Sequence, residues 1–225
     1  MRDTSIATKT DLTLLRADAT VRDYEALFTQ AQEYGVRAVC VPPWRVQAAR
    51  ERLAGTSITV ATVVGFPYGY DLTNVKMTDA VTAVISGATE IDMVMHLGRF
   101  FSGEHDIVRA DIASIVRASA CAVKVILETA LMTNEQIVAA CRIAEDAGAH
   151  FVKTSTGTNP AGGATVEAVR LMRDTVSPHM GVKASGGIRT NDVAHAMVVA
   201  GATVIGTSHL AAMTCADLPE DFGKR

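Results

Sequence analysis

The stretch Gly148-Ala-His-Phe-Val152 decides the fold because it marks a transition that recurs along the chain. In this stretch a glycine follows a helical pattern, small or polar residues come next, and an apolar run begins. Glycine suits the left-handed position just past a helix end, before a strand. The same transition occurs at three other places: Gly35-Val-Arg-Ala-Val39, Gly87-Ala-Thr-Glu-Ile91 and Gly201-Ala-Thr-Val-Ile205.

The spacing of these four glycines predicts the number of repeated units. They lie 52, 61 and 53 residues apart, and one βα unit takes roughly 25–30 residues in a barrel of about 250. Each gap therefore holds two units, which gives about eight units for the chain. No linker divides the sequence, so we expect a single α/β domain over residues 1–225, a (β/α)8 TIM barrel.

The alternative architecture is an open, doubly wound sheet. Such a sheet usually carries a glycine fingerprint after its first strand. The segment Asp11-Leu-Thr-Leu-Leu-Arg16 contains no glycine, which favours the closed barrel. The expected strands lie near 10–13, 36–41, 59–64, 90–95, 123–128, 151–154, 181–184 and 203–206. The expected helix starts are Thr20, with Asp23 at the third helical position, Thr133 or Asn134, and Thr190 or Asn191.

Composition excludes several classes of protein. The net charge is −3, from 21 basic and 24 acidic residues without like-charge blocks, so no nucleic-acid partner is expected. Charges in the first twenty residues predict no signal peptide, and no run is long enough to span a bilayer, so no membrane partner is expected. Four well-separated cysteines fit buried free thiols in a reducing cytoplasm. The histidine spacing predicts no zinc site.

The informative residues are ionisable side chains inside the expected strands. Lysine and acidic residues are seldom buried, and a buried charge is costly unless it is paired. In a barrel such side chains point inward or stand at the carboxyl ends of the strands, where barrel enzymes do their chemistry. Six of them, three acids and three bases, form the candidate set: Asp11, Asp92, Glu128, Lys124, Lys153 and Lys183. Lys124 and Glu128 are expected to supply supporting ion pairs.

Two of these lysines occur in matching sequences, Phe151-Val-Lys-Thr-Ser-Thr-Gly157 and Gly181-Val-Lys-Ala-Ser-Gly-Gly187. They are 30 residues apart, which is one βα unit, so they belong on adjacent strands about 4.8 Å apart. Burial and the neighbouring ammonium both lower a lysine pKa, and a neutral amine attacks carbonyls to form an imine. Asp92 is placed to shuttle protons through a water.

A purely structural interpretation is also open, in which the lysines only pair with Asp92 and Glu128 to close the barrel. Matching positions and following glycine loops favour the functional interpretation. The loops after the last three strands, Gly157-Thr-Asn-Pro-Ala-Gly-Gly163, Ser185-Gly-Gly187 and Gly206-Thr-Ser208, predict a phosphate site. A short helix over 208–213 is expected to contribute to it. For any one loop alone, tight turns are the simpler explanation.

These motifs, together with Glu90-Ile-Asp-Met-Val94 and Lys124-Val-Ile-Leu-Glu-Thr129, resemble those of the deoxyribose-phosphate aldolase family from Asp11 to about Ser208. The resemblance implies reversible cleavage of 2-deoxy-D-ribose 5-phosphate to glyceraldehyde 3-phosphate and acetaldehyde, without metal or organic cofactor. It implies a Schiff base on Lys153, a pKa-lowering role for Lys183 and proton relay by Asp92. It also implies phosphate binding at Gly157, Gly186, Gly187, Thr207 and Ser208, and substrate contacts near Asp11, Thr13 and Cys40.

The chain departs from the family pattern at a few positions: Leu12, His96 and Thr158 differ from residues common in the family, and the tail lacks a terminal tyrosine. Two alternatives follow. One keeps the lysine chemistry but acts on another phosphorylated aldol, and the other is a non-catalytic barrel that binds a phosphorylated metabolite. The expected partners are a small phosphosugar and an aldehyde, and a homodimer is the expected assembly.

Overall fold

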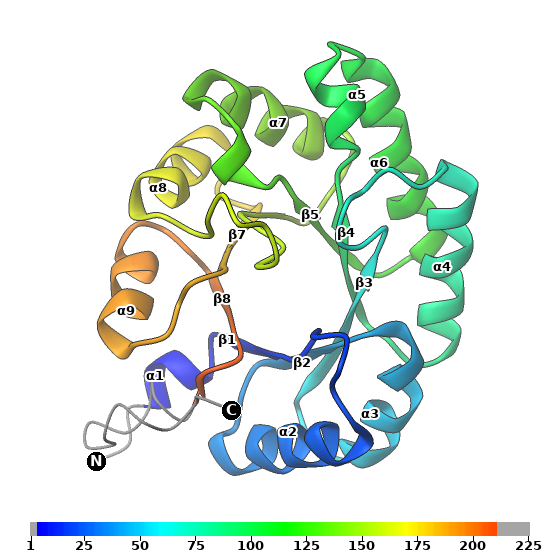
Figure 1. Ribbon diagram of the computed structural model, residues 1–225, viewed down its shortest axis with the longest axis vertical. Helices are drawn as coiled ribbons and strands as arrows, with labels where there is room; N and C mark the ends of the chain where they lie inside the picture. Colours follow the sequence, from blue (N-terminus) through cyan, green and yellow to red (C-terminus); the bar gives the residue numbers. More distant parts are fainter. Residues whose placement is uncertain (1–3, 211–225) are drawn as a thin grey trace.

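The computed structural model describes residues 4–210. Within that range eight parallel strands close into a barrel, each hydrogen-bonded to the next in chain order and the last to the first (Figure 1). The closed barrel expected from the glycine spacing is confirmed, and the open sheet is excluded. The strands are β1 (Thr10–Thr13), β2 (Ala38–Val41), β3 (Thr59–Val64), β4 (Glu90–Val94), β5 (Ala122–Ile126), β6 (Phe151–Lys153), β7 (Gly181–Ser185) and β8 (Val204–Thr207).

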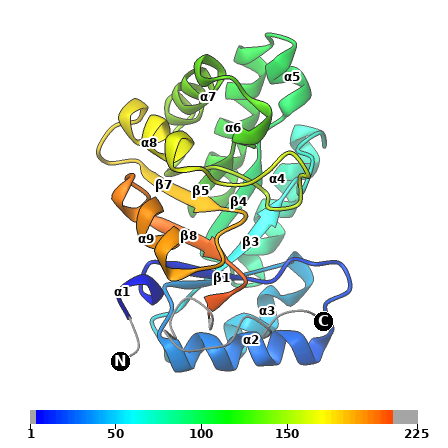
Figure 2. The same cartoon turned by 60° about the vertical axis from the view of Figure 1, so that its left-hand side comes forward.

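Helices form a ring outside the strands, and they remain outside when the molecule is turned (Figures 1 and 2). In the described part of the chain, no helix is both long and apolar enough to cross a bilayer. The helices are α1 (Thr4–Ala7), α2 (Val21–Tyr34), α3 (Val46–Arg52), α4 (Thr73–Ile85), α5 (Leu97–Phe101), α6 (His105–Ser119), α7 (Asn134–Asp146), α8 (Val166–Thr175) and α9 (Asn191–Val199), with short 3-10 turns η1 (Pro43–Arg45) and η2 (Thr129–Leu131).

The expected helix starts are confirmed by their caps. Thr20 and Asp23 form a capping box at the start of α2, in which the Asp23 N–H donates to the Thr20 hydroxyl and the Thr20 N–H donates to the Asp23 carboxylate. Thr133 forms the equivalent box at α7, and Thr190 caps α9. These bonds satisfy N–H groups that have no partner inside the helix.

The glycine transitions also have the expected geometry. Gly35 ends α2 with φ 61° and ψ 48°, the left-handed conformation that a side chain would disfavour. The corresponding glycines before β4, β6 and β8 likewise have positive φ. Each helix is thereby turned back toward the start of the next strand.

The apolar core lies between the strands and the helices, where the outward faces of the strands meet the inward faces of the helices. The interior of the barrel is different. A small apolar cluster there comprises Cys40, Ala61 and Val63, while much of the remaining interior is ionic. The buried charged residues of the strands are Asp11, Glu90, Asp92, Lys124, Lys153 and Lys183.

Two sequence expectations are wrong in detail. Strand β5 ends at Ile126, so Glu128 lies outside the strand, in the left-handed conformation with φ 58°. Cys121 is half-buried, whereas Cys40 and Cys141 are buried; all three are free thiols. The expected short helix over 208–213 and the fourth cysteine, Cys215, fall wholly or partly outside the described residues.

Candidate active site

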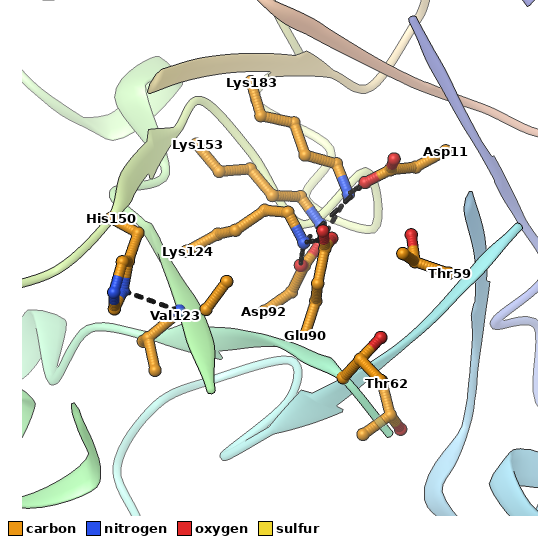
Figure 3. Close-up of polar contacts among 12 residues, drawn as sticks. Asp11, Thr59, Thr62, Glu90, Asp92, Val123, Lys124, His150, Lys153 and Lys183 are labelled. Atoms are coloured by element: carbon orange, nitrogen blue, oxygen red, sulfur yellow. Dashed lines mark hydrogen bonds and ion pairs between the residues drawn. The ribbon is translucent and has the colours of Figure 1, made fainter. Parts of the chain in front are cut away.

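Three lysines converge on one carboxylate inside the barrel (Figure 3). Lys153 on β6 and Lys183 on β7 are in register, and the Nζ atom of each donates to Asp92 Oδ2 at 2.7 Å. Lys124 on β5 donates to the other oxygen, Asp92 Oδ1, at 2.8 Å. The expected closeness of the two amines is therefore confirmed. Asp92 contacts both amines directly.

A second set of ion pairs lies next to this carboxylate. Asp11 Oδ2 on β1 accepts from Lys183 Nζ at 2.6 Å, and Glu90 Oε2 on β4 lies 2.6 Å from Lys124 Nζ. The guanidinium of Arg37, just before β2, bridges the two acids: its Nε lies 2.7 Å from Asp11 Oδ1 and its Nη1 lies 2.7 Å from Glu90 Oε1. The barrel interior thus holds one continuous ionic network.

The network contains more cations than anions. Its four basic side chains face three carboxylates, so one positive charge has no matching acid. In the ion pairs of residues 4–210, Lys153 contacts Asp92 alone, whereas Lys124, Lys183 and Arg37 each contact at least two carboxylates. Because an unpaired buried charge is costly, Lys153 is the base that most readily gives up its proton.

The pKa shifts of the lysines agree with this pairing. Burial lowers the pKa of Lys153, and the nearby Lys183 lowers it further against the opposing effect of Asp92. Burial also disfavours the charged form of Lys183, but Asp11 and Asp92 outweigh it and raise that pKa above its ordinary value. Burial would raise the pKa of Asp92, yet Lys124, Lys153 and Lys183 hold it well below its usual range. The result is an anionic Asp92 between a charged Lys183 and a Lys153 that is easier to deprotonate.

A pocket of about 290 Å³ opens above Lys153 at the carboxyl end of the barrel. All five residues expected to bind phosphate line it, and so does Thr13. Three basic side chains that the sequence analysis did not select also line it, and no acidic residue is among its lining residues. Lys153, Arg16 and Arg189 therefore give an anionic ligand a positive wall within an otherwise neutral lining. The expected residues are Gly157, Gly186, Gly187, Thr207 and Ser208, and the added bases are Arg16, Arg189 and His209.

Two of the pocket loops are joined to each other. The Ala164 N–H donates to the carbonyls of Ser185 and Gly186 at 3.1 and 3.0 Å. Gly163 approaches so closely that a Cβ atom there would lie 2.3 Å from the Gly186 carbonyl oxygen. Glycine at 163 therefore allows the loop after β6 to pack directly on the loop after β7.

The other expected site residues lie below the pocket or beside it. Asp11 is fully buried within the ionic network, and its carbonyl accepts from the Thr13 hydroxyl at 2.9 Å. Cys40 is also buried, and burial followed by the negative charge of Asp92 raises the pKa of its thiol to about 11. Neither Asp11 nor Cys40 lines the pocket.

Of the two residues expected to supply supporting ion pairs, only Lys124 does so. The Glu128 carboxylate instead accepts from the Thr156 hydroxyl at 2.6 Å, and no ion pair of Glu128 is found among the described residues. The reason is geometric: beyond the end of β5 its side chain reaches the loop after β6 rather than the barrel interior. Glu128 therefore supports a pocket loop.

Sequence reasoning missed Glu90 and Arg37 as members of the network. Glu90 stands two residues before Asp92 in the same strand, and side chains two apart point to the same face. Its place in the barrel interior could therefore have been predicted from the sequence. Arg37 lies inside the expected strand 36–41 and carried the same signal, although β2 itself begins only at Ala38. In residues 4–210, no group of three or more His, Cys, Asp or Glu side chains is arranged to hold a metal ion.

The barrel, the lysine–carboxylate cluster and the positive pocket define the class of protein: a (β/α)8-barrel enzyme of the aldolase type. The family model described as "DeoC/LacD family aldolase" matches residues 5–212, and the chain belongs to this family.

Relatives and solved structures agree. A deoxyribose-phosphate aldolase from Methanothermobacter thermautotrophicus is 51% identical over 203 residues, covering 90% of this chain and 91% of the relative. Another from Caldanaerobacter subterraneus is 48% identical over 208 residues, covering 91% of this chain and 90% of the relative. The tetrameric deoxyribose phosphate aldolase structure from Aeropyrum pernix superposes with a TM-score of 0.86 at 34% identity, covering 93% of this chain and 89% of the other.

Proposed function

We propose that this enzyme reversibly cleaves 2-deoxy-D-ribose 5-phosphate to D-glyceraldehyde 3-phosphate and acetaldehyde, through a Schiff base on Lys153. The observation that carries the proposal is the position of Lys153: it lines the pocket and contacts a single carboxylate in a network with excess positive charge. The substrate follows from the names of the relatives. The same names favour this reaction over another phosphorylated aldol or a non-catalytic barrel.

In the first step the neutral Lys153 Nζ attacks the C1 aldehyde carbon of the open-chain sugar. The carbinolamine that forms loses water, and the product is a protonated imine that carries a positive charge on nitrogen. The proton required by the departing hydroxyl comes from the Asp92–Lys183 pair, whose atoms lie 2.7 Å apart. Asp92 also contacts Lys153 Nζ at 2.7 Å, so proton transfer needs no large movement.

In the second step the bond between C2 and C3 breaks. A base removes the proton from the C3 hydroxyl, C3 becomes the aldehyde of glyceraldehyde 3-phosphate, and the bonding electrons move to C2 to form an enamine. The iminium nitrogen accepts this electron pair, which is why the imine makes the cleavage easier. Protonation at C2 followed by hydrolysis releases acetaldehyde and returns Lys153 to its amine form. Asp92, in contact with both lysines, is the proposed proton relay.

The positive wall of the pocket is the proposed phosphate site. Backbone N–H groups of the glycine loops are suited to phosphate oxygens, and Arg189 lines the same pocket. Thr158, which follows Gly157, brings no charge; its hydroxyl lies 3.0 Å from that of Thr156. The positive charge that binds the phosphate is therefore assigned to Arg189 and not to position 158.

The test is turnover of 2-deoxy-D-ribose 5-phosphate, measured as aldehyde release, in the native enzyme and in Lys153→Leu. We expect turnover to vanish in Lys153→Leu and to remain in Lys9→Leu, a matched change at an exposed lysine. The unphosphorylated sugar should be bound much more weakly. Full turnover by Lys153→Leu is incompatible with the proposed reaction.

The chain is further proposed to be one folding domain over residues 1–225 and to work in the cytoplasm.

We also propose that it forms a homodimer. Tyr68 and Tyr70 stack with ring centroids 5.3 Å apart, and with the neighbouring Leu72 they are exposed and supply an apolar surface for assembly. Light scattering should give twice the chain mass. Unfolding in urea should follow one cooperative transition.

A further inference from the structure

A charged pair lies at the amino-terminal end of the barrel, opposite the pocket. Glu90 is the first residue of β4, and Arg37 immediately precedes β2. The two form a bidentate pair, in which Arg37 Nη1 lies 2.7 Å from Glu90 Oε1 and Arg37 Nη2 lies 2.5 Å from Glu90 Oε2. Neither residue lines the pocket, so neither touches a substrate bound there.

Two chains of contacts run from this pair to Lys153. In one, Arg37 contacts Asp11, Asp11 contacts Lys183, and Lys183 contacts Asp92 Oδ2. In the other, Glu90 contacts Lys124, and Lys124 contacts Asp92 Oδ1. Both chains end on the carboxylate that is the acidic partner of Lys153 (Figure 3). A charge removed at the amino-terminal end therefore changes the balance around Lys153 without changing the pocket.

We infer that Arg37 and Glu90 are positioning residues that set how readily Lys153 gives up its proton. This inference rests on the proposed function of Lys153. With Arg37 present the network holds four bases against three acids, and discharging Lys153 brings it to balance. Without Arg37 the three remaining lysines match the three acids, so Lys153 retains its proton. Without Glu90 the excess of positive charge grows, and Lys153 loses its proton more easily.

Several other charged or titratable groups bear on Lys153, and each of these remains in place in the test. From β2 the Cys40 thiol acts on it, although burial keeps that thiol protonated. At the pocket Arg16 and Arg189 add positive charge, whereas burial and the charge of Arg189 lower the pKa of His209. Within residues 4–210 these groups are Asp11, Cys40, Asp92, Lys124 and Lys183 around the network and Arg16, Arg189 and His209 at the pocket.

The experiment is an NMR titration of the lysine side chains labelled with ¹³C at Cε, which measures the pKa of Lys153 without any substrate. The sequence has six lysines, and Lys153→Arg identifies the signal. In Arg37→Gln the midpoint of the Lys153 titration should rise by about one pH unit, because one positive charge has been removed from the network. In Glu90→Gln it should fall. In the double variant Arg37→Gln/Glu90→Gln, which removes one charge of each sign, it should return to the native value.

A second readout follows the rate at which acetaldehyde and cyanoborohydride alkylate Lys153 at each pH. The acid limb of this rate profile should move with the NMR midpoints. At a pH on that limb, Arg37→Gln should therefore be labelled roughly ten-fold more slowly than the native enzyme. Arg37→Lys retains the charge and should keep the native profile. Absence of any adduct on native Lys153 would contradict the proposed function, whereas the NMR midpoints still decide the role of the pair.

A midpoint that is unchanged in Arg37→Gln, or that moves the same way in Arg37→Gln and Glu90→Gln, overturns the inference. General loosening of the barrel would move both single variants in one direction and would not be reversed in the double variant. If Arg37→Gln does not fold, Glu90→Gln and the double variant decide the question. A native-like midpoint in Glu90→Gln then rejects the inference.

Discussion

Lys153 and Lys183 are the same residue type at the same register position of adjacent strands, yet their surroundings shift their pKa values in opposite directions. Lys183 lies between Asp11 and Asp92, which stabilise its charge. Lys153 has only Asp92 and opens into the pocket. The opposite pKa shifts therefore come from the number of carboxylates that each amine contacts.

The first prediction concerns the pH dependence of activity in Lys183→Met. Lys153 must be neutral to react, so activity falls as the pH drops through its pKa. The positive charge of Lys183 lowers that pKa, so its removal should raise the pKa of Lys153 and move the acid limb of kcat/KM to higher pH. A loss of about 10²-fold at neutral pH corresponds to a shift of about two units.

The control is Lys9→Met, which changes an exposed lysine and should leave the profile in place. Part of the activity of Lys183→Met should return at alkaline pH, because the amine then loses its proton without help. A Lys183→Met profile that overlays the native one would show that the two amines are not coupled.

Outside the barrel, a buried ion pair joins two neighbouring helices. Lys76 on α4 donates to Asp111 Oδ2 on α6 at 2.9 Å and to the Val94 carbonyl at the end of β4 at 3.3 Å. Both charged side chains are buried, and Thr73 donates to the other carboxylate oxygen at 2.7 Å. This contact fixes α4 and α6 to the end of the strand that carries Asp92.

We predict that Lys76→Met destabilises the protein by about 3–5 kcal/mol, because it leaves a buried carboxylate unpaired. Urea denaturation followed by circular dichroism measures the free energy of unfolding. The double variant Lys76→Met/Asp111→Leu should recover much of the loss, since both charges are then absent. The exposed pair Arg109–Asp106 is the control: Arg109→Ala should change stability by less than about 1 kcal/mol. Equal effects at the two pairs would contradict the prediction.

The contact between the loops after β6 and β7 gives a third prediction. Gly163→Ala forces the chain away from the Gly186 carbonyl, since its Cβ would lie 2.3 Å from that oxygen. The loop after β6 would then lose the shape that is proposed to bind the phosphate. We expect KM for the phosphorylated sugar to rise about ten-fold, equivalent to about 1.4 kcal/mol.

Gly98→Ala is the matched control for this substitution. Gly98 lies in α5, its φ is not positive, and an added Cβ would come no closer than 3.7 Å to its neighbours. Alanine is the better helix former, so KM should stay unchanged. A KM of Gly163→Ala equal to that of the native enzyme would show that the loop contact does not shape the phosphate site.

For the molecule as a whole, the repeating pattern of the chain was sufficient to predict the barrel. Helix-ending glycines, caps and apolar runs are local features, so the strands could be placed with small errors at their ends. The error at Glu128 has a local cause. Residues other than glycine seldom adopt positive φ, and nothing in its neighbours signals that the chain leaves β5 at Ile126.

The ionic network could be predicted only in part, because its contacts join distant parts of the chain. Asp11 and Lys183 are 172 positions apart, and no local pattern says which lysine receives the second carboxylate. The matching sequence motifs singled out Lys153 and Lys183 as a pair. Only the resemblance to a known family ranked Lys153 above Lys183 as the residue that forms the Schiff base. The structure adds one observation that favours the same ranking: Lys153 contacts one carboxylate and Lys183 contacts two.

The central claim is that Lys153 is the nucleophile. The most direct test is to incubate the native enzyme with acetaldehyde, reduce it with borohydride and map the adduct by peptide mass spectrometry. We expect one two-carbon adduct, on the peptide containing Lys153, and none there without the aldehyde. An adduct on Lys183 or Lys124 instead, or no adduct at all in an enzyme that turns over substrate, would contradict the account.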